Sequence, residues 1–148
     1  MADFETFLKE KTEEMLDKMG LPSKVTLKPT EDRVLIELEP QDEEDTSLLI
    51  GYHGQTLNAL QTILRSATFK DFKEAPSILV ETGGYRKERE EELTRRALEA
   101  ADKARFLLKE VSFPAMSSYE RRTIHMTLAQ EKGVRTESRG EGRERHTV

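Results

Sequence analysis

The stretch LLIGYHGQTLNALQTILRSAT, residues 48–68, carries the strongest structural signal in the chain. Apolar residues recur through it at intervals of three and four, which predicts a helix that begins at about Gln55 and buries one stripe of side chains. The stripe consists of Leu57, Leu60, Ile63, Leu64 and Ala67. The tetrapeptide GYHG, residues 51–54, stands directly before this helix. A two-glycine loop is therefore expected at the amino end of the helix.

The GYHG loop has the composition of a phosphate-binding turn. Gly51 and Gly54 allow the backbone to approach a ligand closely, and the following helix points its unpaired N–H groups at the same place. The spacing alone also fits, and by itself favours, a turn between two helices that holds no ligand. A Walker loop is excluded, because Gln55 stands where its GK[ST] sequence needs Lys and no strand of the right kind precedes the loop.

The rest of the first half alternates between helix and strand patterns. Apolar spacing over residues 4–19 predicts a helix, and period-two alternation over 24–29 and 33–40 predicts an antiparallel hairpin. Residues 42–45 are expected to form an acidic loop, and SILVET, residues 77–82, is expected to form a strand. The predicted order of elements up to this point is αββααβ.

A glycine pair, Gly83-Gly84, marks the expected boundary between two domains. The first domain would span residues 1–83 and the second residues 84–148. The second domain would open with a long helix over residues 85–110, whose leucines and alanines share one face between charged side chains that can pair.

The remainder of the second domain is expected to form a small sheet around one more helix. KEVSFP, residues 109–114, is a strand candidate, and Ser117 or Ser118 can cap a helix that Gly133 ends. Residues 134–148 predict a hairpin with glycines at its turn. Together these elements would give a three-stranded sheet, and the fold class of the whole chain would be α+β.

Arg121 and His125 lie four residues apart on the second of these helices, so both side chains project from the same face. Seen alone, such a pair is more often a solvated or capping pair than a ligand site. Further arginines nearby favour a phosphate-binding patch, because guanidinium groups make fork-like contacts with phosphate oxygens. These arginines are Arg122, Arg135, Arg139, Arg143 and Arg145.

Composition limits the classes of function. With 0 Cys and 3 His, the chain has no thiol nucleophile and few transition-metal ligands, so no metal or cofactor is expected. No Ser or Asp stands at a recognisable catalytic spacing from His53, so we expect no enzyme. The acidic start and the lack of a long apolar run predict neither a signal peptide nor a membrane span, which fits a cytoplasmic protein.

Net charge limits the way in which the chain could bind nucleic acid. The total is −5, and it is uneven: nine basic and 16 acidic side chains leave residues 1–75 at −7, whereas 15 basic and 13 acidic ones leave residues 76–148 at +2. Bulk positive charge is absent, so a few local contacts would have to supply the affinity for a nucleic acid.

The two motifs, taken together in this order, resemble a known architecture. Residues 48–68 resemble the GxxG core of a bacterial K-homology (KH) domain. Residues 117–148 resemble the R-3-H domain, which is named for an Arg, three further residues and a His. A KH domain followed by an R-3-H domain is typical of the bacterial Jag family, also called SpoIIIJ-associated or KhpB-like proteins, which bind RNA. The resemblance covers nearly the whole chain from about residue 22.

The resemblance implies which residues would contact nucleic acid. The GxxG loop would clamp the backbone, and an apolar groove lined by Ile50, Leu57 and strand residues near Ile36 and Leu38 would hold bases. Tyr52 stands with His53 where family members often have Lys or Arg, which leaves less charge and offers an aromatic ring for stacking. The full set of expected contact residues is Gly51, Tyr52, His53, Gly54, Gln55, Arg121, Arg122, His125, Arg135 and Arg139.

The expected function is therefore binding of single-stranded RNA, with single-stranded DNA as an alternative ligand, by a cytoplasmic regulator or chaperone of RNA. The N-terminal Jag domain of longer family members is not found, so their membrane-side role is not expected. A different class of function stays open. The chain could be a scaffold that pairs with a small KH-domain protein and contacts RNA only secondarily, and the acidic first half favours this alternative.

Overall fold

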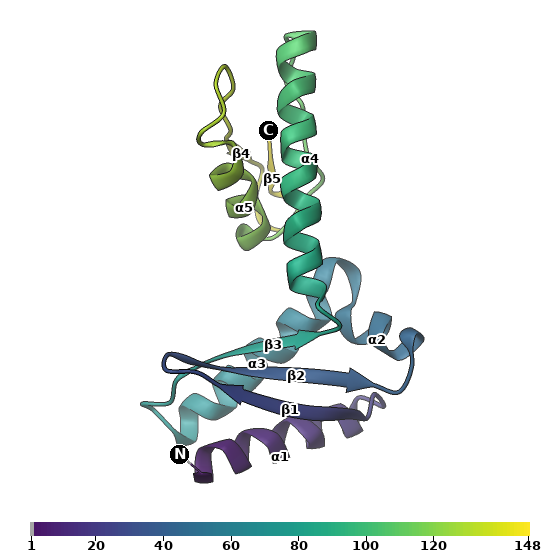
Figure 1. Cartoon of the computed structure of the whole chain (residues 1–148), viewed down its shortest axis with the longest axis vertical. Coiled ribbons are helices and arrows are strands. Elements are labelled where there is room, and N and C mark those ends of the chain that lie inside the picture. Colours follow the sequence, from purple (N-terminus) through teal and green to yellow (C-terminus); the bar gives the residue numbers. More distant parts are fainter. Residues whose placement is uncertain (1) are drawn as a thin grey trace. The chain divides into compact units, whose positions relative to one another are not determined.

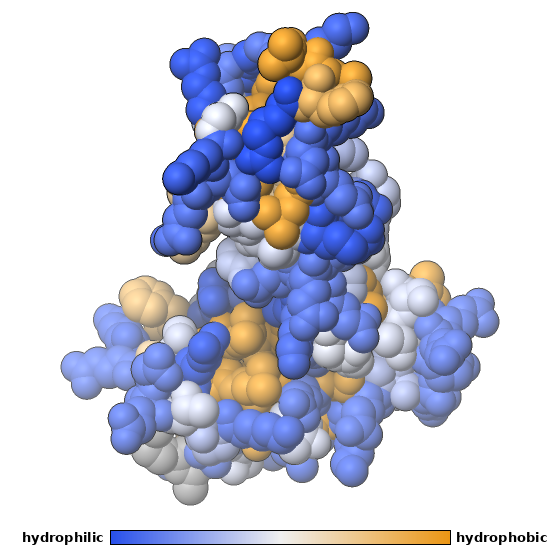
Figure 2. Space-filling model, turned by 45° about the horizontal axis from the view of Figure 1, so that its top comes forward, coloured by the Kyte–Doolittle hydropathy of each residue, from blue (hydrophilic) through white to orange (hydrophobic). Residues whose placement is uncertain are grey.

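The computed structural model describes residues 2–148 and divides them into two units, one that ends at Tyr85 and one that starts at Arg86. The described elements of the first unit are a three-stranded sheet with helices, and those of the second are helices with a short strand pair (Figure 1). The predicted α+β class is confirmed. On the face drawn in Figure 2, hydrophilic side chains cover most of the surface and apolar ones gather in a few patches, in keeping with 36% charged residues.

The predicted hairpin of the first unit is confirmed. Strands β1 (Ser23–Pro29) and β2 (Arg33–Pro40) pair antiparallel, and Val25 lies opposite Leu38. Strand β3 (Ser77–Thr82) pairs parallel to β2, so β2 is the central strand. Alternate residues of each strand are buried on one face, as the period-two pattern requires.

Helices pack on the buried face of this sheet. Helices α1 (Ala2–Lys18) and α3 (Gln55–Asp71) lie against the strands, and α2 (Glu43–Ile50) belongs to the crossover that joins the parallel strands β2 and β3 (Figure 1). Of the predicted stripe of α3, Leu57, Leu60 and Leu64 are buried in the core, Ala67 is half-buried and Ile63 is 53% exposed. The fully buried core side chains include Leu8, Leu16, Val34, Leu49, Leu64, Ile78 and Val80.

Three residues that were expected to line a groove for bases belong to this core instead. Ile36, Leu38 and Leu57 are 0, 1 and 0% exposed. Their side chains fill the space between the sheet and the helices, so the prediction that they contact bases is wrong. Of the expected groove, Ile50 alone keeps a partly exposed side chain.

The acidic residues 42–45 do not form the loop that was predicted. Asp42 is the N-cap of α2, and its Oδ1 accepts a hydrogen bond from the backbone N–H of Asp45 at 2.8 Å. Glu43, Glu44 and Asp45 then form the first turn of the helix. Carboxylates stabilise this position, because the amino end of a helix carries a partial positive charge.

Two helices form the core of the second unit. Helix α4 (Tyr85–Leu107) is the predicted long helix, and α5 (Ser118–Leu128) begins after the predicted N-cap Ser117. Their buried side chains are Leu93, Ala97, Ala101, Ile124 and Leu128. An ion pair joins the same two helices: Arg89 Nε lies 2.8 Å from Glu120 Oε1, and both side chains are nearly buried.

The sheet of the second unit is smaller than predicted. Strands β4 (Ser138–Arg139) and β5 (His146–Thr147) form the expected hairpin. Residues 109–114 form no strand, because only isolated hydrogen bonds tie this neighbourhood to the hairpin, such as Phe113 N–H to the Thr147 carbonyl at 2.9 Å. The sheet therefore has two strands rather than three in the described residues.

Helix α5 also ends earlier than predicted, at Leu128 rather than at Gly133. Ala129 is the one apolar residue in the segment AQEKG that separates Leu128 from Val134. A further helical turn would therefore have no apolar face to bury, and tertiary packing supplies most of the stability of a short helix.

The buried position of Leu57 predicts a large effect on stability. We expect Leu57→Ala to lower the free energy of unfolding by about 2–5 kcal/mol, through lost burial and the cavity left behind. Ile63→Ala, on the exposed side of the same helix, should change it by less than about 0.5 kcal/mol. Urea unfolding followed by circular dichroism measures both. Equal effects of the two substitutions would contradict the placement of Leu57 in the core.

Candidate nucleic-acid interface

The GYHG loop is folded tightly onto the start of α3. Gly51 has φ 72°, and a Cβ atom added to it would lie 2.2 Å from Thr56 Oγ1. Gly54 has φ 78°, and a Cβ atom there would lie 2.8 Å from Cε1 of the Tyr85 ring. Glycine is therefore required at both positions for two reasons: the backbone has a positive φ, and there is no space for a side chain.

Between the two glycines, Tyr52 and His53 form a stacked pair. Residues Tyr52–Gly54 make one turn of 3-10 helix, in which His53 has left-handed backbone angles, φ 51° and ψ 32°. The two ring centroids are 4.0 Å apart and the ring planes differ by 19°. Tyr52 is 68% exposed. The loop thus presents an aromatic surface to solvent and has no Lys or Arg of its own.

The amino end of α3 is left open by this loop. Gly54 is the N-cap residue and offers no side chain to the N–H groups of the first turn, in which Gln55 is exposed. The first turn also has no acidic residue, in contrast to the three carboxylates in the first turn of α2. Unpaired N–H groups and the helix dipole together make this end a suitable place for an anion.

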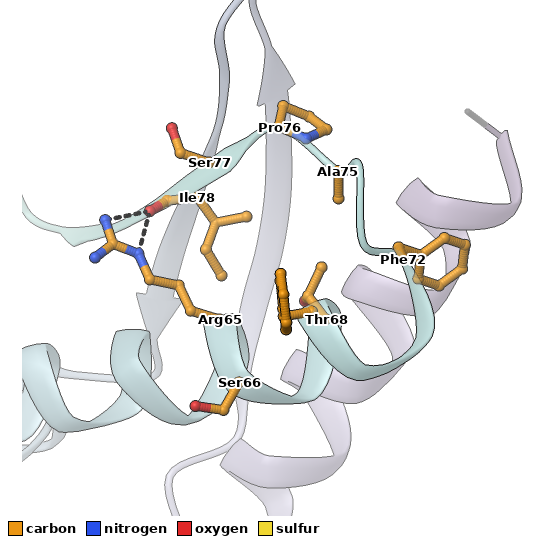
Figure 3. A pocket seen from close by; sticks show the side chains of 9 residues that line it. Arg65, Ser66, Thr68, Phe72, Ala75, Pro76, Ser77 and Ile78 are labelled. Carbon is orange, nitrogen blue, oxygen red and sulfur yellow. Dashed lines mark hydrogen bonds between the residues drawn. The ribbon is translucent and has the colours of Figure 1, made fainter.

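At the other end of α3, an apolar hollow of about 390 Å³ lies between the helix and the start of β3 (Figure 3). Phe69 and Phe72 are among the residues that line it. Arg65 donates from Nε and Nη2 to the carbonyl oxygen of Ile78, at 3.3 and 3.1 Å. The cation beside the hollow is thus bound to backbone, and no residue of the GYHG loop lines it.

The structure brings Arg121 and His125 together through a hydroxyl group. Arg121 Nη1 donates to Ser138 Oγ at 3.2 Å, and His125 Nε2 lies 3.0 Å from the same oxygen. His125 Nδ1 lies 2.6 Å from Thr136 Oγ1, and Arg121 Nε donates to the Met116 carbonyl at 3.3 Å. The pair shares one face, as its spacing predicts, and that face is turned to the hairpin.

The other predicted arginines differ in what they contact. Arg139 is held by Glu110, at 2.9 and 3.0 Å, and by Glu137. Hydrogen bonds from Arg139 lower the pKa of the Glu110 carboxyl, and the positive charge of nearby Arg135 lowers this pKa further. The side chains of Arg122, Arg135 and Arg143 are exposed and form no ion pair or hydrogen bond among the residues that the structure describes, whereas Arg145 Nη1 donates to the Gly140 carbonyl at 2.8 Å. Charge is therefore available to a ligand at Arg122, Arg135 and Arg143.

Two hydroxyl residues, Thr136 and Ser138, were missed as partners in this cluster. A signal for them exists in the sequence, because they are two residues apart in a predicted strand and so project from the same face. Nothing in the sequence pairs that face with Arg121 and His125, since the contact depends on how the hairpin packs on α5.

Other kinds of site find no support in the described part of the chain. Within residues 2–148, no three His, Asp or Glu side chains lie together in a way that could hold a metal ion. No helix in this range is both long and apolar enough to cross a membrane.

Comparison with known proteins gives matches to both halves of the chain. Residues 5–78 match the family described as KhpA/KhpB, KH domain, and residues 91–148 match the R-3-H domain family. The chain is 37% identical over 107 residues to an RNA-binding protein KhpB of Bacillus subtilis, covering 71% of this chain and 51% of that protein. It is 32% identical over 138 residues to an RNA-binding protein KhpB of Clostridium symbiosum, covering 92% and 61%. The chain thus spans about half the length of these curated relatives.

The contacts of His125 predict that it stabilises the second unit. His125→Ala would remove the contact of its ring with the Thr136 hydroxyl and leave Ser138 with Arg121 alone, so we expect a loss of about 1–3 kcal/mol in stability. The melting temperature of this unit should fall by several degrees. Arg122→Ala, on the same helix but without contacts, is the matched control and should leave melting unchanged. Unchanged melting of the His125 variant together with weaker RNA binding would instead assign His125 to the ligand.

Proposed function

Because the chain belongs to the KhpA/KhpB family of KH-domain proteins and carries an R-3-H domain after its KH domain, we propose that it binds single-stranded RNA in the cytoplasm, as a regulator or chaperone of RNA. The names of its relatives, which describe them as RNA-binding proteins, support RNA as the ligand. No chemical step is part of the proposal.

The observation that carries the proposal is the GYHG loop on the uncapped amino end of α3. With no side chain at Gly51 or Gly54, a phosphate can approach the backbone, and the N–H groups of the first turn of α3 can donate to its oxygens. A GxxG loop that clamps the backbone of about four nucleotides is the KH way of holding RNA. The absence of acidic residues from this turn keeps the site open to an anion.

The second unit contributes positive charge to the proposal. Arg122 and Arg135 are exposed, and we assign to them contacts with phosphates. Arg121 and His125 then act as positioning residues, because their hydrogen bonds fix the hairpin that carries Arg135. Arg139 has the same supporting role, since carboxylates already occupy its guanidinium group.

A partner protein is the second candidate, and one observation favours it. Phe69, on α3, is 66% exposed and lines the apolar hollow together with Phe72, and exposed apolar patches are typical of protein contacts. A small KH-domain protein is the partner that the KhpA/KhpB family name suggests. RNA that copurifies with the native chain, after crosslinking, would favour the main proposal, and its absence would favour the partner.

The charge of the loop supplies a direct test. We expect Tyr52→Asp with His53→Asp to abolish measurable binding of single-stranded RNA, because two carboxylates would repel the phosphate in a partly desolvated site. Folding should survive, since the loop is exposed and Asp tolerates the left-handed backbone of residue 53. Thr62→Asp with Ser66→Asp, two exposed positions of α3, adds the same charge away from the loop and should retain binding. Fluorescence anisotropy with labelled RNA and DNA of one sequence measures each variant.

Salt dependence tests the role of the arginines. With two phosphates neutralised, by Arg122 and Arg135, log K should fall against log salt with a slope of about −1.4, at ~0.7 per phosphate. Arg122→Ala should reduce the slope by about 0.7, whereas Arg139→Ala should leave it unchanged, because Glu110 and Glu137 already neutralise Arg139. A slope steeper than about −6 would show an extended basic surface that the proposal lacks.

A further inference from the structure

We propose that Tyr52 is a stacking subsite for one unpaired base of the bound strand. The inference rests on the proposed function and adds to it what the loop recognises: the flat face of a base, in addition to a phosphate. In this loop, an aromatic contact from Tyr52 would take the place of the cationic contact that a Lys or Arg between the two glycines would make.

The geometry of the ring pair supports this assignment. Tyr52 and His53 stack at 4.0 Å with an interplanar angle of 19°, so one face of the tyrosine is covered by the imidazole. The side chain is nevertheless 68% exposed, which leaves its other face to solvent. A base placed on that face would extend the stack to three rings. Every base has a π face, so the subsite would accept any of the four.

The pair is held in place before any ligand binds. His53 has left-handed backbone angles, and the glycines on both sides of the pair fit closely against Thr56 and Tyr85. A tyrosine side chain also has few rotatable bonds to immobilise. Stacking on this platform would therefore cost little conformational entropy, and most of the contact energy would appear as affinity.

The position of the platform suits a strand whose phosphate lies at α3. Tyr52 is three residues before Gln55, the first residue of the helix whose N–H groups would hold that phosphate. A nucleotide bound by its phosphate at the helix end can thus place its own base, or that of a neighbour, on the tyrosine. The loop has no Lys or Arg, and the exposed ring face of Tyr52 is the largest contact surface that its side chains offer to a base.

The chain has no tryptophan, so Tyr52→Trp introduces a single fluorescent reporter at the subsite. We expect a single-stranded RNA tetranucleotide to quench this fluorescence. The same tetranucleotide without bases should not quench it, although its phosphates are unchanged. Phe69→Trp is the matched control, because Phe69 is 66% exposed in the same unit and about 20 Å further along α3. Its fluorescence should not respond to the tetranucleotide.

Affinity gives a second readout that separates the two levels of the proposal. Tyr52→Leu should weaken RNA binding about 5- to 150-fold, the range for loss of one base–aromatic stack, and should leave the salt slope unchanged. Tyr52→Phe should bind as the parent does. The stacking subsite would be overturned if the Tyr52→Leu variant bound RNA as tightly as the parent chain does, or if the abasic strand quenched the fluorescence. Either result would leave the RNA-binding proposal intact. Failure of the parent chain to bind RNA would overturn both.

Discussion

The lack of room for a single methyl group at two positions determines the shape of the candidate site. The loop 51–54 approaches α3 so closely that a side chain at Gly51 would meet Thr56, and one at Gly54 would meet the ring of Tyr85. Any larger residue would push the loop away from the helix end. Glycine at position 54 also leaves the N-cap of α3 without a side chain, so close packing of the loop and an open helix end have one cause.

The sequence predicts the parts of this fold that depend on local pattern. The stripe of α3, the hairpin of β1 and β2, the long helix α4 and the N-cap at Ser117 all follow from residue spacing and capping chemistry, and the structure contains them. The membership of the KH and R-3-H families, predicted from GYHG and from Arg121 with His125, is confirmed by the matches to both families.

The errors occur where non-local packing decides. Residues 109–114 have the composition of a strand, but whether they join a ladder depends on the last residues of the chain, some thirty positions later. Ile36 and Leu38 have the right chemistry for a base-binding groove, yet the helices cover the strand face on which they lie. The spacing of Arg121 and His125 predicts that both side chains lie on one face of α5. The packing of the hairpin on that face decides that the hydroxyl groups of Thr136 and Ser138 contact His125.

The acidity of the chain leaves little long-range attraction for an RNA ligand, and part of the positive charge of the second unit is neutralised within the fold. Three arginines of this unit form ion pairs with carboxylates of another segment: Arg89, Arg105 and Arg139. Their charge holds helices and hairpin together and contributes little to attraction at a distance. RNA binding then has to come from short-range contacts, such as backbone N–H groups, an aromatic face and the exposed side chains of Arg122 and Arg135.

Helix α3 shows how one element separates these tasks along its length. Its buried stripe packs against the sheet. In the second half of the helix, Arg65 donates a hydrogen bond to the Ile78 carbonyl oxygen, and Gln61 Oε1 accepts one from the N–H of Val80 at 2.9 Å. These side chains satisfy backbone groups of β3 that a further strand would need, so this part of the edge is protected against strand addition. The backbone N–H donors that the helix leaves open are those of its first turn. A ligand that seeks backbone donors on this element is thereby directed to the end where the GYHG loop lies.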